Sequence, residues 1–130
     1  MGKKLLLDTH ALIWTIFIPD KLTARARQAL EDGENEIFVS SVSAFEIANK
    51  FRIGKLALAR PLANDFGGFA LREGFLHLAL EHQHARLGGM LPIPHKDPFD
   101  RMLIAQAQLE NLTLVSNEKA FDTFGVTRLW

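Results

Sequence analysis

One apolar run near the amino terminus, Leu5-Leu6-Leu7, ends in a carboxylate, Asp8, and passes directly into helix-forming sequence from Ala11 to Ile18. Hydrophobicity without alternation over the length of a strand predicts burial on both faces, as in a parallel sheet covered by helices. Asp8 then lies where a central strand joins the first helix. Because ligands bind at this carboxyl edge in open α/β sheets, the run predicts both a fold class and the position of a site.

The rest of the chain alternates strand-like and helix-like segments. After the first strand, further strands are predicted over 37–40, 75–80, 112–116 and 126–130. The later helices are predicted over 24–31, 41–53 (capped by Ser41 or Ser43), 61–73, 81–87 (closed by Gly88-Gly89), 98–109 and 117–124. Strands that alternate with helices predict one domain over residues 1–130, an α/β/α sandwich with a central, mainly parallel sheet.

Composition narrows the class of protein. Fifteen basic residues balance fifteen acidic ones, so a nucleic-acid partner has to be argued from local patches and not from net charge. The chain has no cysteine, which excludes disulfides and thiolate metal sites and suits a reducing compartment. No apolar run approaches the about 20 residues of a membrane span, and the run after Lys4 is too short for a signal peptide. We therefore expect a cytoplasmic protein without a membrane partner.

Acidic residues follow several of the predicted strands. Asp8 follows the first strand, Glu46 lies about one turn beyond the second, and Glu118 follows the strand that ends at Ser116. In a parallel sheet all strand-to-helix junctions face the same way, so these residues are expected at one edge. Asp97 and Asp100 lie at the start of a helix, and Asp100 is expected to join the group through that helix N-terminus.

Carboxylates gathered in one pocket repel one another and raise one another's pKa unless a cation neutralises them. A cluster of carboxylates without cysteine, and with little histidine, favours a hard ion such as Mg²⁺ or Mn²⁺. Ions of this kind activate water and stabilise the charge that develops in phosphoryl transfer. The predicted substrate is a phosphodiester.

Each carboxylate also has a purely structural interpretation. Glu46 precedes Lys50 by four residues, the favoured order for an ion pair on a helix surface. The other four can cap a helix or complement its dipole: Asp8 (or its neighbour Thr9), Asp97, Asp100 and Glu118. Only the shared edge favours the functional interpretation of the set.

Four stretches together resemble a PIN domain, specifically the toxin nuclease of a VapBC toxin–antitoxin pair. The most specific is His95-Lys96-Asp97-Pro98-Phe99-Asp100-Arg101, which continues through Met102-Leu103-Ile104-Ala105-Gln106-Ala107. The other three are Leu5-Leu6-Leu7-Asp8-Thr9-His10-Ala11-Leu12-Ile13-Trp14, Ser41-Val42-Ser43-Ala44-Phe45-Glu46-Ile47 and Leu112-Thr113-Leu114-Val115-Ser116-Asn117-Glu118. They span nearly the whole chain in the expected order.

The resemblance implies a metal-dependent endoribonuclease that a small VapB-type antitoxin holds inactive, and a homodimer. It implies that Asp8 and Asp100 hold the principal Mg²⁺ (or Mn²⁺) and that Glu46 is a further ligand or orients the attacking water. Asp97 belongs to the same motif and is a further candidate metal ligand, although its capping role is enough to explain it. The substrate implied is single-stranded or looped RNA, cleaved by metal-activated water.

The fourth acidic position of the family departs from its usual pattern in this chain. The family has aspartate after a strand-end threonine or serine and one variable residue, whereas Ser116-Asn117-Glu118 has glutamate. The extra methylene changes the reach of Glu118 and leaves its metal role open. Ser116 is expected to orient a metal-bound water.

Substrate contacts are expected from basic side chains near the acidic ones. Arg101, beside Asp100, is a candidate for a phosphate contact, with a carboxylate pair as its alternative. Lys50 is a candidate for gripping the RNA backbone near Glu46. His95 precedes the acidic motif and is expected to be a solvated loop residue, with a phosphate contact as its alternative.

Two other functions compete with the nuclease. A haloacid-dehalogenase-like phosphatase would use Asp8 as its nucleophile. In that family a second aspartate follows two residues after the strand-end aspartate, whereas this chain has His10 at that position. A non-catalytic module that only engages an antitoxin would explain the altered Glu118. Loss of divalent-metal binding in Asp8→Asn separates the enzyme from the module.

Overall fold

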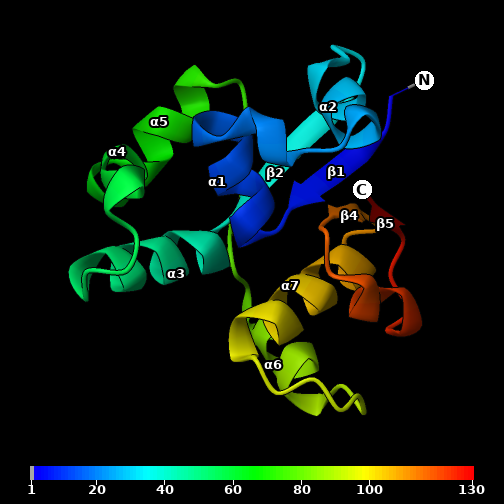
Figure 1. Ribbon diagram of the computed structural model, residues 1–130. Helices are drawn as coiled ribbons and strands as arrows, with labels where there is room; N and C mark the ends of the chain where they lie inside the picture. The colour runs from blue at the N-terminus through cyan, green and yellow to red at the C-terminus, as the bar shows by residue number, and fades with distance from the viewer. Residues whose placement is uncertain (1) are drawn as a thin grey trace.

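The structure, a computed structural model, describes residues 2–130, which contain one five-stranded sheet (Figure 1). The strands lie in the order β3-β2-β1-β4-β5, and every neighbouring pair is parallel. They are β1 (Lys4–Leu7), β2 (Glu36–Ser40), β3 (Leu76–Leu78), β4 (Thr113–Val115) and β5 (Arg128–Leu129). The predicted parallel sandwich is confirmed.

The order of the strands reverses beside β1. The chain builds outward from β1 through β2 to β3, then returns to the other side of β1 for β4 and β5. The carboxyl ends of β1 and β4 therefore flank a topological switch point, where open α/β sheets bind their ligands. Asp8 and Ser116 are the first residues after these two strands.

The leucine run of β1 is buried on both faces of the sheet. Leu5, Leu6 and Leu7 have no exposed surface. Leu5 and Leu7 belong to one apolar cluster and Leu6 to the other, because successive side chains of a strand point to opposite faces. Both faces need an apolar residue, which explains why the run does not alternate.

One layer of helices covers the face that carries Leu5 and Leu7. Its helices are α1 (Thr9–Phe17), α2 (Ala24–Glu31), α4 (Arg60–Asn64) and α5 (Phe66–Arg72), with the short 3₁₀ helices η1 (Pro19–Lys21) and η2 (Ala57–Ala59) between them. The side chains that they bury with the sheet are Ala11, Leu12, Ile13, Ala26, Ala59, Leu62 and Ala70.

The opposite layer covers the face that carries Leu6. Its helices α6 (His82–Met90) and α7 (Pro98–Leu109) lie side by side, apart from α1 and α2 (Figure 1). The side chains that α7 buries against the sheet are Leu103, Ile104 and Ala107, joined by Phe121 of the 3₁₀ helix η3 (Lys119–Thr123). Helix α3 (Ser41–Arg52) contributes to both clusters, with Ile47 in one and Val42 in the other.

The helix predicted over 61–73 is in fact two helices. The break falls at Asp65, between α4 and α5, and not at Gly67-Gly68. The Asp65 carboxylate accepts a hydrogen bond from the Gly68 N–H at 3.1 Å and so caps the second helix. An aspartate competes with the helix for backbone N–H groups, which explains the interruption.

Two helix ends and the type of the last helix also differ from the prediction. Helix α6 does not stop before Gly88-Gly89 but runs on to Met90. Glycine is required there by packing, since a Cβ at Gly88 would lie 3.2 Å from the backbone of α7. The cap of α3 is Ser40, one residue before the predicted Ser41, and the last helix is the 3₁₀ helix η3. Of the helices that the structure describes, none is long and apolar enough to cross a membrane.

Candidate active site

Asp8 is a buried carboxylate at the end of the central strand. Its backbone N–H donates to the Val115 carbonyl at 3.1 Å and so extends the β1–β4 ladder by one residue. Its Oδ1 accepts from the Ala11 N–H at 2.8 Å and caps α1. Burial raises the pKa of Asp8 to about 6, against the lowering effect of hydrogen bonds from Ser116 and Ala11. The cap is real, but a cap alone does not require so buried a carboxylate.

Asp100 lies in the first turn of α7 and faces the same region. Burial raises its pKa, a hydrogen bond from His95 opposes the rise, and the charges of Asp97 and Glu46 add to it. Asp100 in turn contributes to the raised pKa of Asp8. Asp100 is thus close enough to be repelled by both Asp8 and Glu46.

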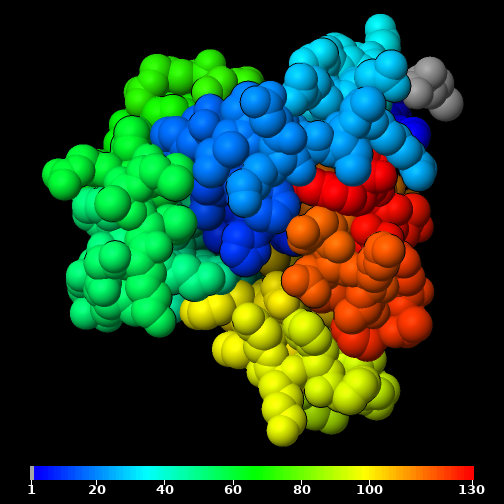
Figure 2. Space-filling view, viewed as in Figure 1, coloured from blue at the N-terminus to red at the C-terminus, as the bar shows by residue number. Residues whose placement is uncertain are grey.

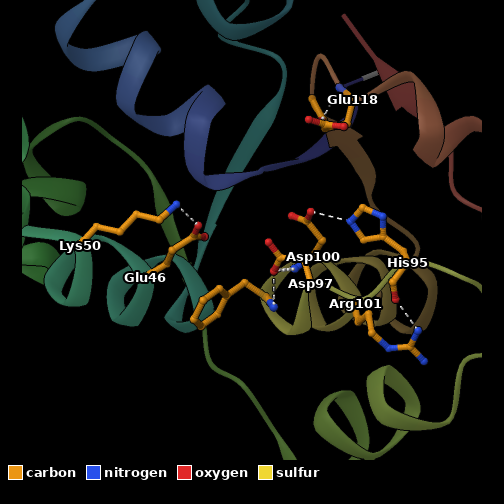
Figure 3. Close-up of polar contacts among 9 residues, drawn as sticks. Glu46, Lys50, His95, Asp97, Asp100, Arg101 and Glu118 are labelled. Carbon is orange, nitrogen blue, oxygen red and sulfur yellow. Dashed lines mark hydrogen bonds and ion pairs between the residues drawn. The ribbon is translucent and has the colours of Figure 1, made fainter. Parts of the chain in front are cut away.

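Glu46 is 6% exposed and is neutralised by a lysine. Lys50 places its Nζ 2.6 Å from Glu46 Oε2, four residues along the same face of α3 (Figure 3). The ion-pair interpretation is therefore confirmed. Contact of Lys50 with RNA stays a prediction, and the lysine side chain is 35% exposed.

Asp97 and Glu118 are exposed, although the charge of Asp97 acts on Asp100. Asp97 Oδ1 accepts from the N–H groups of Phe99 and Asp100 at 2.9 and 3.2 Å, which is the predicted cap of α7. Glu118 follows β4 in a turn, and its carboxylate lies apart from those of Glu46 and Asp100 (Figure 3). The metal role predicted for Glu118 stays a prediction.

Ser116 lies beside Asp8 and is fully buried. Its N–H donates to the Leu129 carbonyl at 3.2 Å, so it continues the β4–β5 ladder as Asp8 continues that of β1 and β4. Its hydroxyl accepts from the Glu118 N–H at 3.0 Å and bonds Asp8. The role predicted for Ser116 with a metal-bound water stays a prediction.

Two buried hydroxyl bridges join the helices that carry the acidic residues. Thr9 Oγ1 lies 3.0 Å from Ser43 Oγ and links the start of α1 to α3. Ser40 Oγ donates to Gln106 Oε1 at 2.6 Å and links the end of β2 to α7. Both bridges are absent from the predicted site, because partners 34 and 66 residues apart leave no local signal.

Arg101 does not face the carboxylates. Its five N–H groups donate to five backbone carbonyls at 2.6 to 3.3 Å, those of Gly88, Gly89, Leu91, Ile93 and His95. A guanidinium has five N–H groups, so none is left for a phosphate. The predicted phosphate contact of Arg101 does not fit this arrangement, nor does its alternative, a carboxylate pair.

His95 is not the solvated loop residue that was predicted. It is 22% exposed, and its Nε2 lies 2.8 Å from Asp100 Oδ2. Its ring packs edge-on against Phe121 and near Phe124 at centroid distances of 5.6 and 5.7 Å. Because His95 lies in a loop between Pro94 and Pro98, no helical or strand periodicity in the sequence could have predicted this contact.

The donor set fits a hard divalent cation. Carboxylate oxygens are the ligands such ions prefer. Burial raises the pKa values of Asp8 and Asp100, repulsion between carboxylates adds to the rise, and a cation would offset both. Within residues 2–130, no three acidic or histidine side chains stand close enough to hold one ion together. With Glu46 engaged by Lys50, Asp8 and Asp100 are the pair available to an ion.

The segments that carry these residues meet on one face of the molecule. In Figure 2 the surfaces of α1, α3, the start of α7 and the segment after β4 meet at the centre of the view. A ligand at this place touches four segments that are distant in the chain.

Comparison with known proteins agrees with this architecture. The family model for the PIN domain matches residues 5–126. The solved structure of DNA-bound VapBC from Salmonella typhimurium is 24% identical, with a TM-score of 0.70 over 98% of this chain and 97% of that chain. VapBC2 from Rickettsia felis, bound to a promoter DNA fragment, is 17% identical, with a TM-score of 0.69 over 98% and 99%. VapBC-1 from nontypeable Haemophilus influenzae is 12% identical, with a TM-score of 0.66 over 96% of each chain. No curated protein matches the chain in sequence.

Proposed function

The chain belongs to the PIN domain family, and on that premise we propose that it is a metal-dependent endoribonuclease, the toxin of a type II toxin–antitoxin pair. The observation that carries the proposal is the pair Asp8 and Asp100. Both carboxylates lie at the switch point of the sheet, and burial raises the pKa of each. A buried carboxylate and a half-buried one that repel each other favour the binding of a divalent cation between them.

Asp8 and Asp100 would hold the ion, Mg²⁺ or Mn²⁺. When bound, such an ion supplies a water of lowered pKa and offsets charge on the scissile phosphate. Glu46 lies next to this pair and, once released by Lys50, either joins the ligands or accepts a proton from the attacking water. Ser116 is buried beside Asp8 and is placed to orient that water through its hydroxyl.

Lys50 has a further part in this proposal. Its ammonium neutralises Glu46 while its side chain remains one-third exposed. An incoming RNA phosphate competes with Glu46 for the same ammonium, so substrate binding and the release of Glu46 are coupled. Glu118 and Asp97 have peripheral roles, with Asp97 accounted for by its cap.

The proposed partner is a VapB-type antitoxin, and the proposed assembly contains a homodimer. Support for the antitoxin comes from the structures that share this fold, several of which are VapBC proteins, and the homodimer rests on the family resemblance alone. The likeness to them extends over at least 96% of this chain.

The test is cleavage of a mixed pool of RNA by the purified protein, freed of antitoxin, with Mg²⁺ or Mn²⁺ and with EDTA. Wild type, Asp8→Asn and the exposed control His82→Ala are compared. We expect metal-dependent cleavage by wild type and by the control, and none by Asp8→Asn. Cleavage that survives EDTA or Asp8→Asn contradicts the proposal, and absence of both cleavage and metal binding in wild type favours the non-catalytic module.

A further inference from the structure

The loop between α6 and α7, residues 91–97, is held by one side chain. Arg101 donates to the carbonyls of Leu91, Ile93 and His95 at 2.6, 3.1 and 2.8 Å. It also donates to the carbonyls of Gly88 and Gly89, at the end of α6, at 2.8 and 3.3 Å. A cation at the last carbonyls of a helix is favoured by the helix dipole and supplies donors that those carbonyls lack.

The close packing of α6 on α7 makes this reach possible. A Cβ at Gly88 would lie 3.2 Å from the Arg101 carbonyl oxygen and 3.2 Å from the Met102 Cα. Glycine therefore allows the last turn of α6 to approach the first turn of α7. The guanidinium then spans from α7 to both the helix end and the loop.

The same loop carries a side chain that contacts Asp100, one of the proposed metal ligands. His95 is fixed at three points: its carbonyl by Arg101, its ring by Phe121 and Phe124, and its Nε2 by Asp100. A carboxylate only accepts hydrogen bonds, so Nε2 is the donor to Asp100 Oδ2. Figure 3 shows His95 between Asp100 and Arg101, with the guanidinium directed away from the carboxylates.

We propose that Arg101 and His95 are positioning residues for Asp100: Arg101 holds the 91–97 loop in the conformation that lets His95 fix the Asp100 carboxylate. His95 takes Oδ2 and leaves Oδ1 for the ion. The inference rests on the proposed function, because it requires Asp100 to be a metal ligand. In this proposal Arg101 acts on the site indirectly, by its hydrogen bonds to five backbone carbonyls, and does not contact the substrate phosphate.

The physical basis is the conformational entropy of the Asp100 carboxylate. A carboxylate free to rotate loses that freedom when it binds an ion, whereas one already held by a hydrogen bond does not. Loss of an outer hydrogen-bond partner of a metal ligand typically costs about 10–100-fold in metal affinity. Lysine cannot replace Arg101, since its ammonium has three donors at one point and the guanidinium has five in a rigid fork.

The first experiment measures Mn²⁺ affinity by electron paramagnetic resonance, which counts free Mn²⁺ and needs no RNA. His95→Ala is expected to weaken binding about tenfold or more. His95→Gln, whose amide can donate to Asp100, is expected to recover part of that loss. His82→Ala, an exposed histidine at the start of α6, is the matched control and is expected to bind as wild type does. Wild-type affinity in His95→Ala overturns the proposal.

The second experiment measures hydrogen exchange across residues 91–97 together with Mn²⁺ affinity in Arg101→Lys. Faster exchange in the loop and weaker Mn²⁺ binding are expected, with neither change in Arg86→Lys, an exposed arginine on α6. Faster exchange with unchanged Mn²⁺ affinity overturns the coupling between loop and site. If Arg101→Lys does not fold, the comparison of His95→Ala with His95→Gln still tests the positioning of Asp100.

The two proposals fail in distinguishable ways. If wild type binds no Mn²⁺, or Asp8→Asn binds as tightly as wild type, the metal site itself is wrong and both proposals fall. If Asp8→Asn abolishes binding while His95→Ala does not weaken it, only the positioning role is wrong.

Discussion

Asp8 and Glu118 both follow a strand of the same parallel sheet, yet one is buried and the other exposed. Asp8 is the first residue after β1, and its N–H still bonds the neighbouring strand, so the ladder fixes its direction. The equivalent position after β4 is Ser116, whose N–H bonds Leu129 in the same way. Glu118 comes two residues later, in a turn. Proximity to a strand end brings a residue to the edge, and the last ladder position directs it into the site.

The largest expected effect separates these two residues. Asp8→Asn keeps the cap of α1, since asparagine is as good an N-cap as aspartate, but removes a proposed ligand. We expect Mn²⁺ affinity to fall by at least about 100-fold, more than for the loss of an outer partner. Glu118→Gln makes the same chemical change at the exposed position, and we expect a loss of about threefold at most. Isothermal titration with Mn²⁺ measures both, and equal losses would show that Glu118 is a ligand.

The next effect is on stability, and its sign follows from the raised pKa. Asp8 titrates near pH 6 in the folded protein and near 3.8 when unfolded. The folded state therefore binds the proton more tightly, and stability falls as the pH rises from about 4 to about 6. At about 1.4 kcal/mol for each pH unit the decrease is of the order of 3 kcal/mol.

Because asparagine does not titrate, Asp8→Asn does not lose stability in this way as the pH rises. In EDTA we expect the variant to be more stable than wild type at pH 7.5 by about 1–3 kcal/mol, and the difference to shrink toward pH 4. Urea unfolding at both values of pH measures it. An Asp8→Asn variant less stable than wild type at pH 7.5 would mean that the buried carboxylate is stabilising without metal.

The smallest effect concerns the lysine that neutralises Glu46. In Lys50→Met the buried Glu46 loses its counterion, so we expect Mn²⁺ to bind about fivefold more tightly. This corresponds to about 1 kcal/mol, the upper end of the range for a partly exposed ion pair. RNA cleavage is expected to fall, because the ammonium is also the proposed phosphate contact. Arg52→Met is the control, because Arg52 is an exposed basic residue two positions further along α3 and the substitution removes the same charge. Unchanged Mn²⁺ affinity would show that Glu46 lies outside the metal site.

Much of this architecture could be predicted from residues close together in the chain. The leucines of β1 predicted a doubly covered strand, and the strand-end and helix-start positions of Asp8 and Asp100 placed them at one edge. The cap by Asp97 and the pair Glu46–Lys50 are local as well, at spacings that helices make regular.

The missed features depend on contacts between distant segments. The direction of the Arg101 side chain is set by the approach of α6 at Gly88, and the Thr9–Ser43 bridge by the packing of α1 on α3. His95 contacts Asp100 from a proline-bounded loop, and no repeating sequence pattern predicts the conformation of such a loop. The break at Asp65 was missed because its cap on Gly68 competes with an otherwise helical pattern.

The most direct test of the account is a crystal structure grown with Mn²⁺, measured for anomalous scattering. The account predicts an anomalous peak bonded to Asp8 and Asp100, with His95 still on the second oxygen of Asp100. A peak held by Asp97 or Glu118 without Asp8, or no peak at saturating Mn²⁺, would contradict it.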